Sequence, residues 1–495
     1  MGIGGWFKKK MQTWLEIIPP PTEQAIVIQR EHTRELEVLR SQLWYQGDAN
    51  ELFQFFHQTE TSTGAFWSVS PSSSKVRKIH SGLPAIIADT FAYIVKSDID
   101  DIEAPPEWDD IAESVNFSEL VGQAVCDTLV SGDGAFKISV DTELSEYPIV
   151  EFISGDRVDI EQKRGVLEAV TFRTMYTVRS VRYVLHERYS RGRIETSLTD
   201  ISGNAVPLSK VSELADIPLV VEFDGDFIMA LPLRFYADKK YRGRGKSIFS
   251  GGKSQCFDAL DEVISQWLDA VRAGRVVKYI PLDLIPRDPS TGALQDVSSF
   301  GAEVIQIKGT LNEMQGNKIE VVQPDIRYEA FVSAYVNALL MCLQGLVSPA
   351  TLGIDVGKMS SAEAQREKKD VTGNTRNTIT TALEKVLPQL INAVLMTYEN
   401  MLGGSPEQHE VTVTFGEYGA PDFDSRVETV GKAATYGVMS VKTQVDELWG
   451  SSKDDEFKEA EVQRKSKIVT VGDVTTSNEV YSLLMQTGLC YRGLM

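Results

Sequence analysis

Two amphipathic segments of similar length, 254–273 and 327–345, flank an insert of about 50 residues and constrain the fold of this chain most strongly. Each segment keeps its apolar side chains at helical spacing, and Gly274 ends the first. Two helices joined by an insert predict a hairpin that carries a small module at its tip. The apolar stripes consist of Phe257, Leu260, Val263, Ile264, Trp267, Leu268 and Val271 in the first segment and of Tyr328, Phe331, Val332, Tyr335, Leu339, Cys342 and Leu343 in the second.

The first segment also carries an acidic ridge. Asp258, Glu262, Ser265 and Asp269 follow one another at spacings of four, three and four, so they share a helical face away from the apolar stripe. In a monomer this ridge is a solvated surface. In a ring of subunits it would repeat around a central hole, repel phosphates and let a nucleic-acid duplex slide without strong binding.

The segments that follow the first helix have different textures. The insert, 275–326, contains prolines and two short strand-like runs, and the loop 347–361 follows the second helix. A third helix is predicted from 361 to 402, with a capping box formed by Ser360 and Glu363. It would be about 60 Å long and kinked at Pro388.

Residues 135–225 are rich in β-branched and aromatic residues. The runs AFKISVD, YPIVEFI and VTFRTMYTVRSVRYVLHERY, with turn signals at Ser154-Gly155 and Arg191-Gly192, predict an antiparallel sheet. Helical patterns lie on both sides of this region, including a pair within 34–56 that is broken at Gly47. The fold class is therefore predicted as α+β.

The C-terminal part of the chain adds one strand and more helices. The run EVTVTFGEY predicts a strand, and the last 75 residues or so are expected to be mainly helical. Serines typical of helix N-caps stand at Ser440, Ser452 and Ser477.

The chain has 50 basic and 70 acidic side chains among 495 residues, a formal charge of −20. Proteins that read DNA sequence usually contact phosphates through many Lys and Arg side chains, so the acidic charge balance argues against a sequence-specific DNA-binding protein. It leaves open a protein through which nucleic acid passes. Four scattered cysteines and five isolated histidines predict neither a disulfide framework nor a structural zinc site. Polar residues interrupt the most apolar stretch, 328–347, so it is predicted to be a packed helix and no membrane span is expected.

The stretch 238–254 approaches a phosphate-binding loop without completing one. The pattern GxxxxGK[ST] fails because Lys240 and Ser247 stand where its first glycine is required, so ATPase activity has no support. No nucleophile, base and acid form a recognisable catalytic set, and we predict no enzymatic activity, cofactor or metal. A basic patch remains, expected to be a linker or a subunit contact before a phosphate contact: Lys239, Lys240, Arg242, Arg244, Lys246 and Lys253.

Three stretches, 243–292, 348–369 and 436–450, together resemble the portal proteins of tailed bacteriophages, especially those of siphophages of Gram-positive hosts and their prophages. They read GRGKSIFSGGKSQCFDALDEVISQWLDAVRAGRVVKYIPLDLIPRDPSTG, SPATLGIDVGKMSSAEAQREKK and YGVMSVKTQVDELWG. The resemblance implies a ring, usually of about twelve subunits, at one vertex of the capsid. A terminase motor would package double-stranded DNA through this ring, and the DNA would later leave through it.

The resemblance also assigns the parts of a portal subunit to this chain. It implies a wing at 1–253 and 362–420, stem helices at 254–274 and 327–346, a clip at 275–326, a tunnel loop at 347–361 and a mainly helical crown at 421–495.

Three groups of residues receive roles by the same analogy. The stem ridge and the tunnel loop would line the DNA channel, where Lys358 would touch phosphates transiently. The clip would face the terminase and later the head–tail adaptor, and apolar stem residues would pack between subunits. The expected channel residues are Asp258, Glu262, Asp269, Thr351, Asp355, Lys358 and Met359; the expected clip contacts are Tyr279, Asp283, Arg287 and Asp288; the expected inter-subunit residues are Phe257, Leu260, Ile264, Trp267, Phe331, Tyr335 and Leu339.

Expected partners are further copies of the chain, the terminase large subunit, the head–tail adaptor, the major capsid and scaffold proteins, and double-stranded DNA without sequence preference. The expected location is the portal vertex of the virion and, during assembly, the cytoplasm of the bacterial host. Two alternatives stay open: another capsid-associated structural protein that does not form the channel, and a nucleotide-using packaging enzyme. Ring symmetry separates the first from a portal, and an ATPase assay separates the second.

Overall fold

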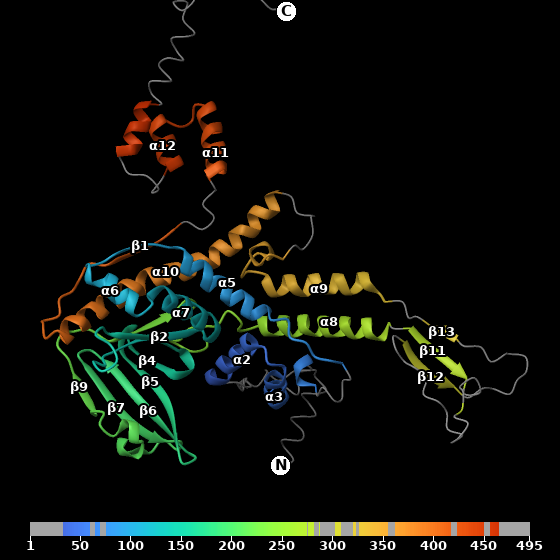
Figure 1. The fold of residues 1–495 in the computed structure, drawn as a ribbon, viewed down its shortest axis with the longest axis horizontal. Coiled ribbons are helices and arrows are strands. Elements are labelled where there is room, and N and C mark those ends of the chain that lie inside the picture. The colour runs from blue at the N-terminus through green and yellow to red at the C-terminus, as the bar shows by residue number, and fades with distance from the viewer. Residues whose placement is uncertain are drawn as a thin grey trace, which may run out of the picture. The chain divides into compact units, whose positions relative to one another are not determined.

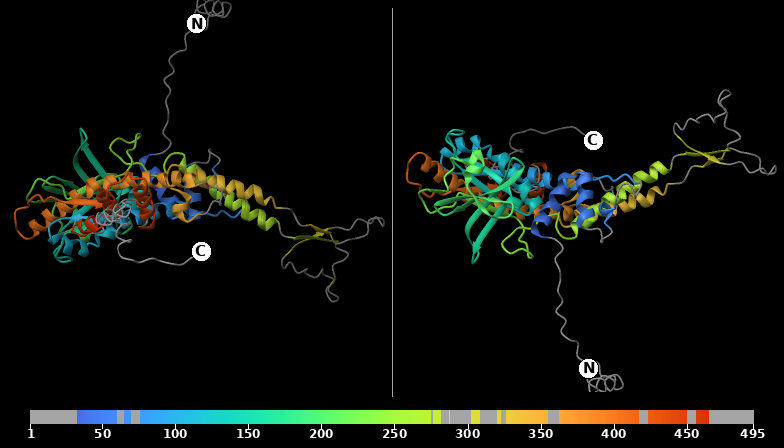
Figure 2. Two further views of the ribbon diagram at one scale, coloured as in Figure 1. Left: turned by 90° about the horizontal axis from the view of Figure 1, so that it is seen from above. Right: turned by 90° about the horizontal axis from the view of Figure 1, so that it is seen from below.

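The computed structural model describes residues 33–59, 65–69, 76–274, 276–281, 287, 302–307, 320–322, 326–354, 362–416, 423–449 and 456–464. The chain divides into two compact units between Gly416 and Glu417. Figures 1 and 2 show the ribbon from three directions. Helices and antiparallel sheets both contribute to the first unit, which confirms the predicted α+β class.

Helices α2 (Arg34–Gln46) and α3 (Ala49–Thr59) form the predicted pair that is broken at Gly47. The Thr33 hydroxyl accepts a hydrogen bond from the Leu36 N–H and caps α2. Gly47 has a φ of 71°, and a Cβ there would lie 2.5 Å from the His80 ring, so only glycine fits. This part of the unit also contains η1 (Phe66–Ser68), α5 (Leu83–Ser97), α6 (Glu107–Ser114) and α7 (Phe117–Ser131).

The predicted antiparallel region forms two sheets. Strands β10 (Ala230–Arg234), β2 (Asp133–Ser139) and β3 (Ile149–Ser154) form the first in that order. The second has the order β4-β5-β6-β7-β8, with β9 also paired to β7, and η2, η3 and η4 lie beside these strands. These elements are η2 (Gly155–Arg157), β4 (Val158–Lys163), β5 (Val166–Val178), β6 (Val181–Ser190), β7 (Arg193–Asp200), β8 (Ala205–Val206), η3 (Leu208–Lys210), η4 (Ser212–Leu214) and β9 (Val220–Glu222).

The long run 170–189 is a hairpin and not one strand. A two-residue turn at Arg179 and Ser180, with φ of 50° and 67°, joins β5 to β6. Two consecutive positive φ values match the twist of a tight hairpin, but glycine and asparagine usually supply them. The sequence therefore contained no ordinary turn signal at this point. The predicted turn at Arg191-Gly192 is confirmed between β6 and β7.

Helix α10 (Ala362–Met401) is continuous over 40 residues, as predicted, and contains Pro388. It is the long orange helix of Figure 1, and it packs against α5, α6, β10 and β14. Strand β14 (Thr412–Phe415), also predicted, pairs antiparallel with β1 (Ile99–Glu103). Four side chains of α10 are completely buried in the core: Leu383, Leu387, Leu390 and Ile391.

The predicted helix pair is present as α8 (Lys253–Ala273) and α9 (Tyr328–Leu343), which lie side by side. Between them the chain forms a three-stranded sheet with the order β12-β11-β13. Strand β11 (Val276–Pro281) runs parallel to β12 (Ala302–Ile307) and antiparallel to β13 (Glu320–Val322). The sequence predicted two strands in this insert, and the structure has a third, the three-residue strand β13. The short turn η6 (Pro349–Leu352) follows α9.

The second unit is helical where it is described. It contains α11 (Phe423–Thr435), α12 (Val441–Trp449) and a helical stretch at 456–464. The rings of Trp449 and Phe457 meet edge to face at 5.4 Å. The Thr443 N–H donates to Ser440 Oγ at 3.1 Å, which confirms the predicted cap at Ser440. The other two predicted caps, Ser452 and Ser477, lie outside the described residues.

Candidate functional site

Aromatic contacts join the C-terminal half of α8 to the N-terminal half of α9. The Trp267 ring stacks on Phe331, with centroids 6.4 Å apart and planes at 5°, and lies 6.3 Å from Tyr335. These three side chains are only half-buried. Farther along the same end, Val271 is 49% exposed and Tyr328 is 62% exposed. This end of the pair therefore presents apolar surface that its own described chain does not cover.

The N-terminal half of α8 is instead buried in the core of its own chain. Phe257 is fully buried between Trp44 and Phe249, with ring centroids at 5.8 and 5.7 Å. Leu260 and Leu339 are also buried within the chain. We expected these three residues at subunit contacts, and the structure contradicts that expectation because their surfaces are already covered. Ile264, Trp267, Phe331 and Tyr335 remain half-buried and stay candidates.

A polar strap, residues 65–69 and 76–82, lies along one face of α8. The Phe66 and Trp67 N–H groups donate to the two carboxylate oxygens of Asp258, at 2.8 and 3.1 Å. Two helical turns further, the Ile79 N–H donates to Ser265 Oγ at 3.0 Å. Ser265 itself is fully buried. Half of the predicted acidic ridge is therefore the contact face for the strap, and Asp258 is not part of an exposed ridge.

Asp261 forms the centre of this contact and is completely buried. Its carboxylate accepts hydrogen bonds from Trp67 Nε1 at 3.1 Å, from the Ser81 N–H at 2.9 Å and from His80 Nδ1 at 2.7 Å. His80 Nε2 lies 3.1 Å from the Trp44 carbonyl oxygen. The His80 ring therefore links the buried Asp261 side chain to the backbone of α2 through its two nitrogens.

The strap also places a lysine among aromatic rings. Lys78 Nζ lies 4.6 Å from the centroid of the Phe66 ring and 5.4 Å from that of Trp67, and it donates to the Phe66 carbonyl. Burial lowers the pKa of Lys78 to about 8, against the attraction of the Asp258 and Glu262 carboxylates. Burial also raises the pKa of Asp258. The hydrogen bonds from the Phe66 and Trp67 N–H groups lower this pKa but only partly offset the effect of burial.

Lys253, at the start of α8, anchors the end of α9. Its ammonium group donates to the carbonyl oxygens of Met341, Cys342 and Gln344, at 3.0, 3.0 and 2.6 Å. These are carbonyls that the last turn of a helix leaves without partners inside the helix. A cation at this end also interacts favourably with the helix dipole.

Two threonines of α10 hold the segment that follows α9. The Ser348 N–H donates to Thr372 Oγ1 at 2.9 Å, and Thr375 Oγ1 donates to the Leu346 carbonyl at 2.7 Å. Thr351 Oγ1 lies 3.1 Å from Thr372 Oγ1. The expected channel residue Thr351 is half-buried, and its hydroxyl contacts Thr372 of the same chain.

The remaining predicted channel and clip residues are only partly described. Glu262 and Asp269 are half-buried on α8, and Glu262 accepts a hydrogen bond from Gln266. Tyr279 lies in β11, and Arg287 is exposed. The other expected residues lie outside the described part of the chain: Asp283, Asp288, Asp355, Lys358 and Met359.

The basic patch at 239–253 is largely used within the chain. Arg244 binds the buried Asp133 through two hydrogen bonds of 2.9 Å, Lys240 pairs with Glu37, and Lys253 holds α9 as described above. Lys239, Arg242 and Lys246 remain exposed.

Asp261 and His80 are the residues of this region that sequence reasoning missed. Asp261 stands between Leu260 and Ile264, at the flank of the apolar stripe, and an acid in that position was the available signal. Within the described residues, no group of three or more His, Cys, Asp or Glu side chains could hold a metal ion. None of the described helices combines the length and the apolarity that a bilayer crossing requires.

Residues 253–469 match the family model described as "Phage portal protein, SPP1 Gp6-like". The matched residues include α8, α9, the sheet between them and α10. This part of the chain is similar to phage portal proteins, so the resemblance to that family is confirmed. The narrower assignment to siphophages of Gram-positive hosts stays a prediction.

Solved structures from a gene transfer agent (GTA) particle are also similar to this chain. The "Virion of native gene transfer agent (GTA) particle" matches with 14% identity and a TM-score of 0.35, over 83% of this chain and 91% of that chain. The "Neck of native GTA particle computed with C12 symmetry" matches with 14% identity and a TM-score of 0.37, over 74% and 89%. The "Neck of empty GTA particle computed with C6 symmetry" matches with 13% identity and a TM-score of 0.34, over 74% of this chain and 89% of that chain. No curated protein matches the chain.

Proposed function

We propose that this chain assembles into a closed ring at the portal vertex of a phage capsid. The ring forms the channel through which double-stranded DNA is packaged and later leaves, and it is the platform for head–tail joining. In this proposal 1–253 and 362–420 form the wing, 254–274 and 327–346 the stem, 275–326 the clip, 347–361 the tunnel loop and 421–495 the crown. The ring has about twelve subunits.

The apolar end of the helix pair carries this proposal. Trp267, Phe331 and Tyr335 contact one another but stay half-buried, and Val271 and Tyr328 are largely exposed beside them. An isolated pair of helices gains little from such a surface, whereas neighbouring copies in a ring would cover it. The family match includes both helices, which supports the same reading.

In this proposal the clip contacts the protein partners, and the stem and the tunnel loop face the DNA. Tyr279, Asp283, Arg287 and Asp288 would contact the terminase large subunit and then the head–tail adaptor. The DNA-facing residues are Glu262 and Asp269 of the stem and Asp355, Lys358 and Met359 of the tunnel loop. Capsid and scaffold proteins would surround the wing, and the chain would act without enzymatic activity of its own.

The mass of the purified protein tests this proposal. Light scattering with negative-stain imaging of the same peak should give about twelve times 54.9 kDa and rings with a central hole. Trp267→Ser should reduce the ring fraction while circular dichroism still shows a folded subunit, with Arg242→Ser as the matched surface control. A stable dimer at every salt concentration, with or without scaffold protein, would instead indicate a capsid-associated protein that does not form the channel. ATP turnover that Lys246→Ala abolishes would indicate a packaging enzyme.

A further inference from the structure

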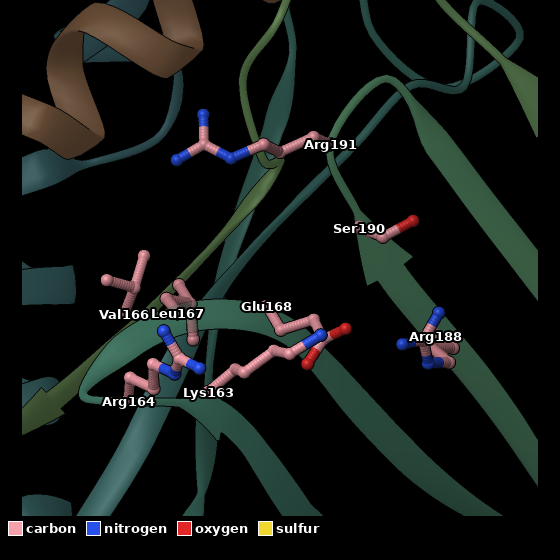
Figure 3. Close-up of a pocket in the computed structure, with 8 residues that line it drawn as sticks. All are labelled: Lys163, Arg164, Val166, Leu167, Glu168, Arg188, Ser190 and Arg191. Carbon is pink, nitrogen blue, oxygen red and sulfur yellow. The ribbon is translucent and has the colours of Figure 1, made fainter.

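An open groove of about 770 Å³ lies at the turns that join β4 to β5 and β6 to β7 (Figure 3). Figure 3 shows the side chains of Lys163, Arg164 and Arg191 on either side of Val166 and Leu167. Val166 is 63% exposed, so the floor of the groove is apolar and open to solvent. The groove thus combines a basic rim with an apolar floor. Its lining also includes Glu168, Arg188 and Ser190.

The basic groups of this rim differ in how far the chain neutralises them. Arg188 is paired with Glu161 at 2.8 Å. Lys163 and Arg164 form no ion pair with any described residue, and both are exposed. The Arg191 guanidinium donates to the Asp226 carbonyl oxygen at 3.1 Å and lies 3.6 Å from the Asp226 carboxylate, which is 85% exposed. The rim therefore keeps an excess of positive charge on a chain whose formal charge is −20.

The opposite charge pattern occurs in the segment 99–114, which forms β1 and α6. No Lys or Arg occurs anywhere between positions 97 and 136. Trp108 and Ile111 are buried and fix α6 against the core, so the carboxylates stand on a rigid support. Seven exposed carboxylates of this segment form no ion pair with a described residue: Asp100, Asp101, Glu103, Glu107, Asp109, Asp110 and Glu113.

The acidic segment and the groove also match in the order of their charged and apolar residues. In the acidic segment the apolar residues Ala104, Pro105 and Pro106 separate two acidic runs, and Pro106 is exposed. In the groove the apolar pair Val166 and Leu167 separates basic side chains. A contact between them would place carboxylates on cations and apolar surface on apolar surface.

We propose that the groove of one copy receives the acidic segment 99–114 of the next copy in the ring. The inference rests on the proposed ring, because a heterologous contact around a ring joins two different surfaces of the same chain. In such a contact the acidic segment of one copy faces the basic groove of its neighbour and not the neighbour's acidic segment. A DNA duplex is a weaker occupant, since it gains nothing from the apolar floor and is repelled by the net charge of the chain.

Charge reversal on each side tests the contact. Lys163→Glu with Arg164→Glu, or Asp109→Lys with Asp110→Lys, should each weaken assembly about tenfold per contact at 0.1 M salt. The four substitutions combined in one chain should restore the ring fraction. The matched control is Arg179→Glu with Arg182→Glu, the same charge change at the other end of β5 and β6, which should leave assembly unchanged. Circular dichroism of each variant confirms that the subunit is folded.

Chemical cross-linking of the wild-type protein supplies a second test. Carbodiimide treatment of mixed labelled and unlabelled rings should link Lys163 to a carboxylate of 99–114 in a different copy. Rings of the expected mass that tolerate both reversals and show no such link would overturn the inference and leave the proposed function standing. Absence of rings under all conditions would contradict both. Retention of duplex DNA that depends on Lys163 and Arg164 would overturn it in favour of a nucleic-acid surface.

Discussion

His80 Nδ1 lies 2.7 Å from Oδ2 of Asp261, and this contact joins the strap to the first helix of the pair. The Asp261 carboxylate is completely buried, and the His80 side chain is 7% exposed. The two residues are 181 positions apart, so the contact connects the N-terminal part of the wing to the proposed stem. Other hydrogen bonds between the strap and α8 lie on either side of this pair.

Removal of either partner of this pair should destabilise the subunit strongly. His80→Ala leaves the buried Asp261 carboxylate without its hydrogen bond to the His80 ring, and loss of a partner of a buried polar group costs about 1–3 kcal/mol or more. Urea unfolding measures the change in the free energy of unfolding. The matched control is Asp269→Asn on the same helix, expected to change it by about 0.5 kcal/mol or less. A loss below about 1 kcal/mol in His80→Ala would show that the pair contributes little.

Lys78 should contribute a distinct pH dependence. Its pKa in the folded chain is lowered to about 8, from 10.5, so the unfolded chain binds more protons between these values. The contribution of this group to stability therefore increases as pH rises from 8 to 10.5, and is fully present above 10.5. NMR titration of the Lys78 side chain should give a midpoint near 8. Lys78→Met should remove this part of the pH dependence, and an unchanged profile would contradict the assignment.

Loss of the Lys253 ammonium should loosen the end of α9. Lys253→Met keeps most of the aliphatic chain but leaves three carbonyl groups without their donor, at a cost of about 1–3 kcal/mol. Hydrogen exchange should increase at 341–347. Lys246→Met, at an exposed position seven residues earlier, provides the control. Equal effects of the two substitutions would mean that the capping contact is not the cause.

Thr372 should hold the base of the proposed tunnel loop. Thr372→Val preserves the shape of the side chain but removes the acceptor of the Ser348 N–H, a buried contact. We expect a loss of about 1–3 kcal/mol and faster hydrogen exchange at 346–352. Thr378→Val removes a hydroxyl that donates to the Asn374 carbonyl of its own helix, and it should leave that segment unchanged. Protection at 346–352 equal to wild type would show that Thr372 is dispensable there.

Lys358 should affect DNA and not assembly. Lys358→Ala removes the basic side chain of the proposed tunnel loop, so packaging or DNA retention should fall while the ring mass stays the same. Lys358→Arg keeps the charge and serves as the control. Loss of the ring in Lys358→Ala would make the residue structural.

Local patterns predicted α2, α3, α8, α9 and α10, whereas α5, α6 and α7 were not predicted individually. The apolar spacing within 254–273 and 327–345 predicted α8 and α9 to within one or two residues, and Gly47 marked the break between α2 and α3. The signals failed where neighbouring residues do not decide the structure. The turn at Arg179-Ser180 has positive φ without glycine, and β13 has only three residues.

The candidate site shows most clearly the difference between what helical periodicity predicts and what depends on contacts between distant segments. Helical periodicity predicts from the residues of α8 alone that this helix has an apolar stripe and a polar face. The segments that cover each face are set by contacts between distant parts of the chain. The strap lies nearly 200 residues before α8 in the chain, and its backbone N–H groups, which carry no sequence signature, occupy Asp258, Asp261 and Ser265. Burial of a polar face depends on contacts between distant segments, and periodicity contains no information about them.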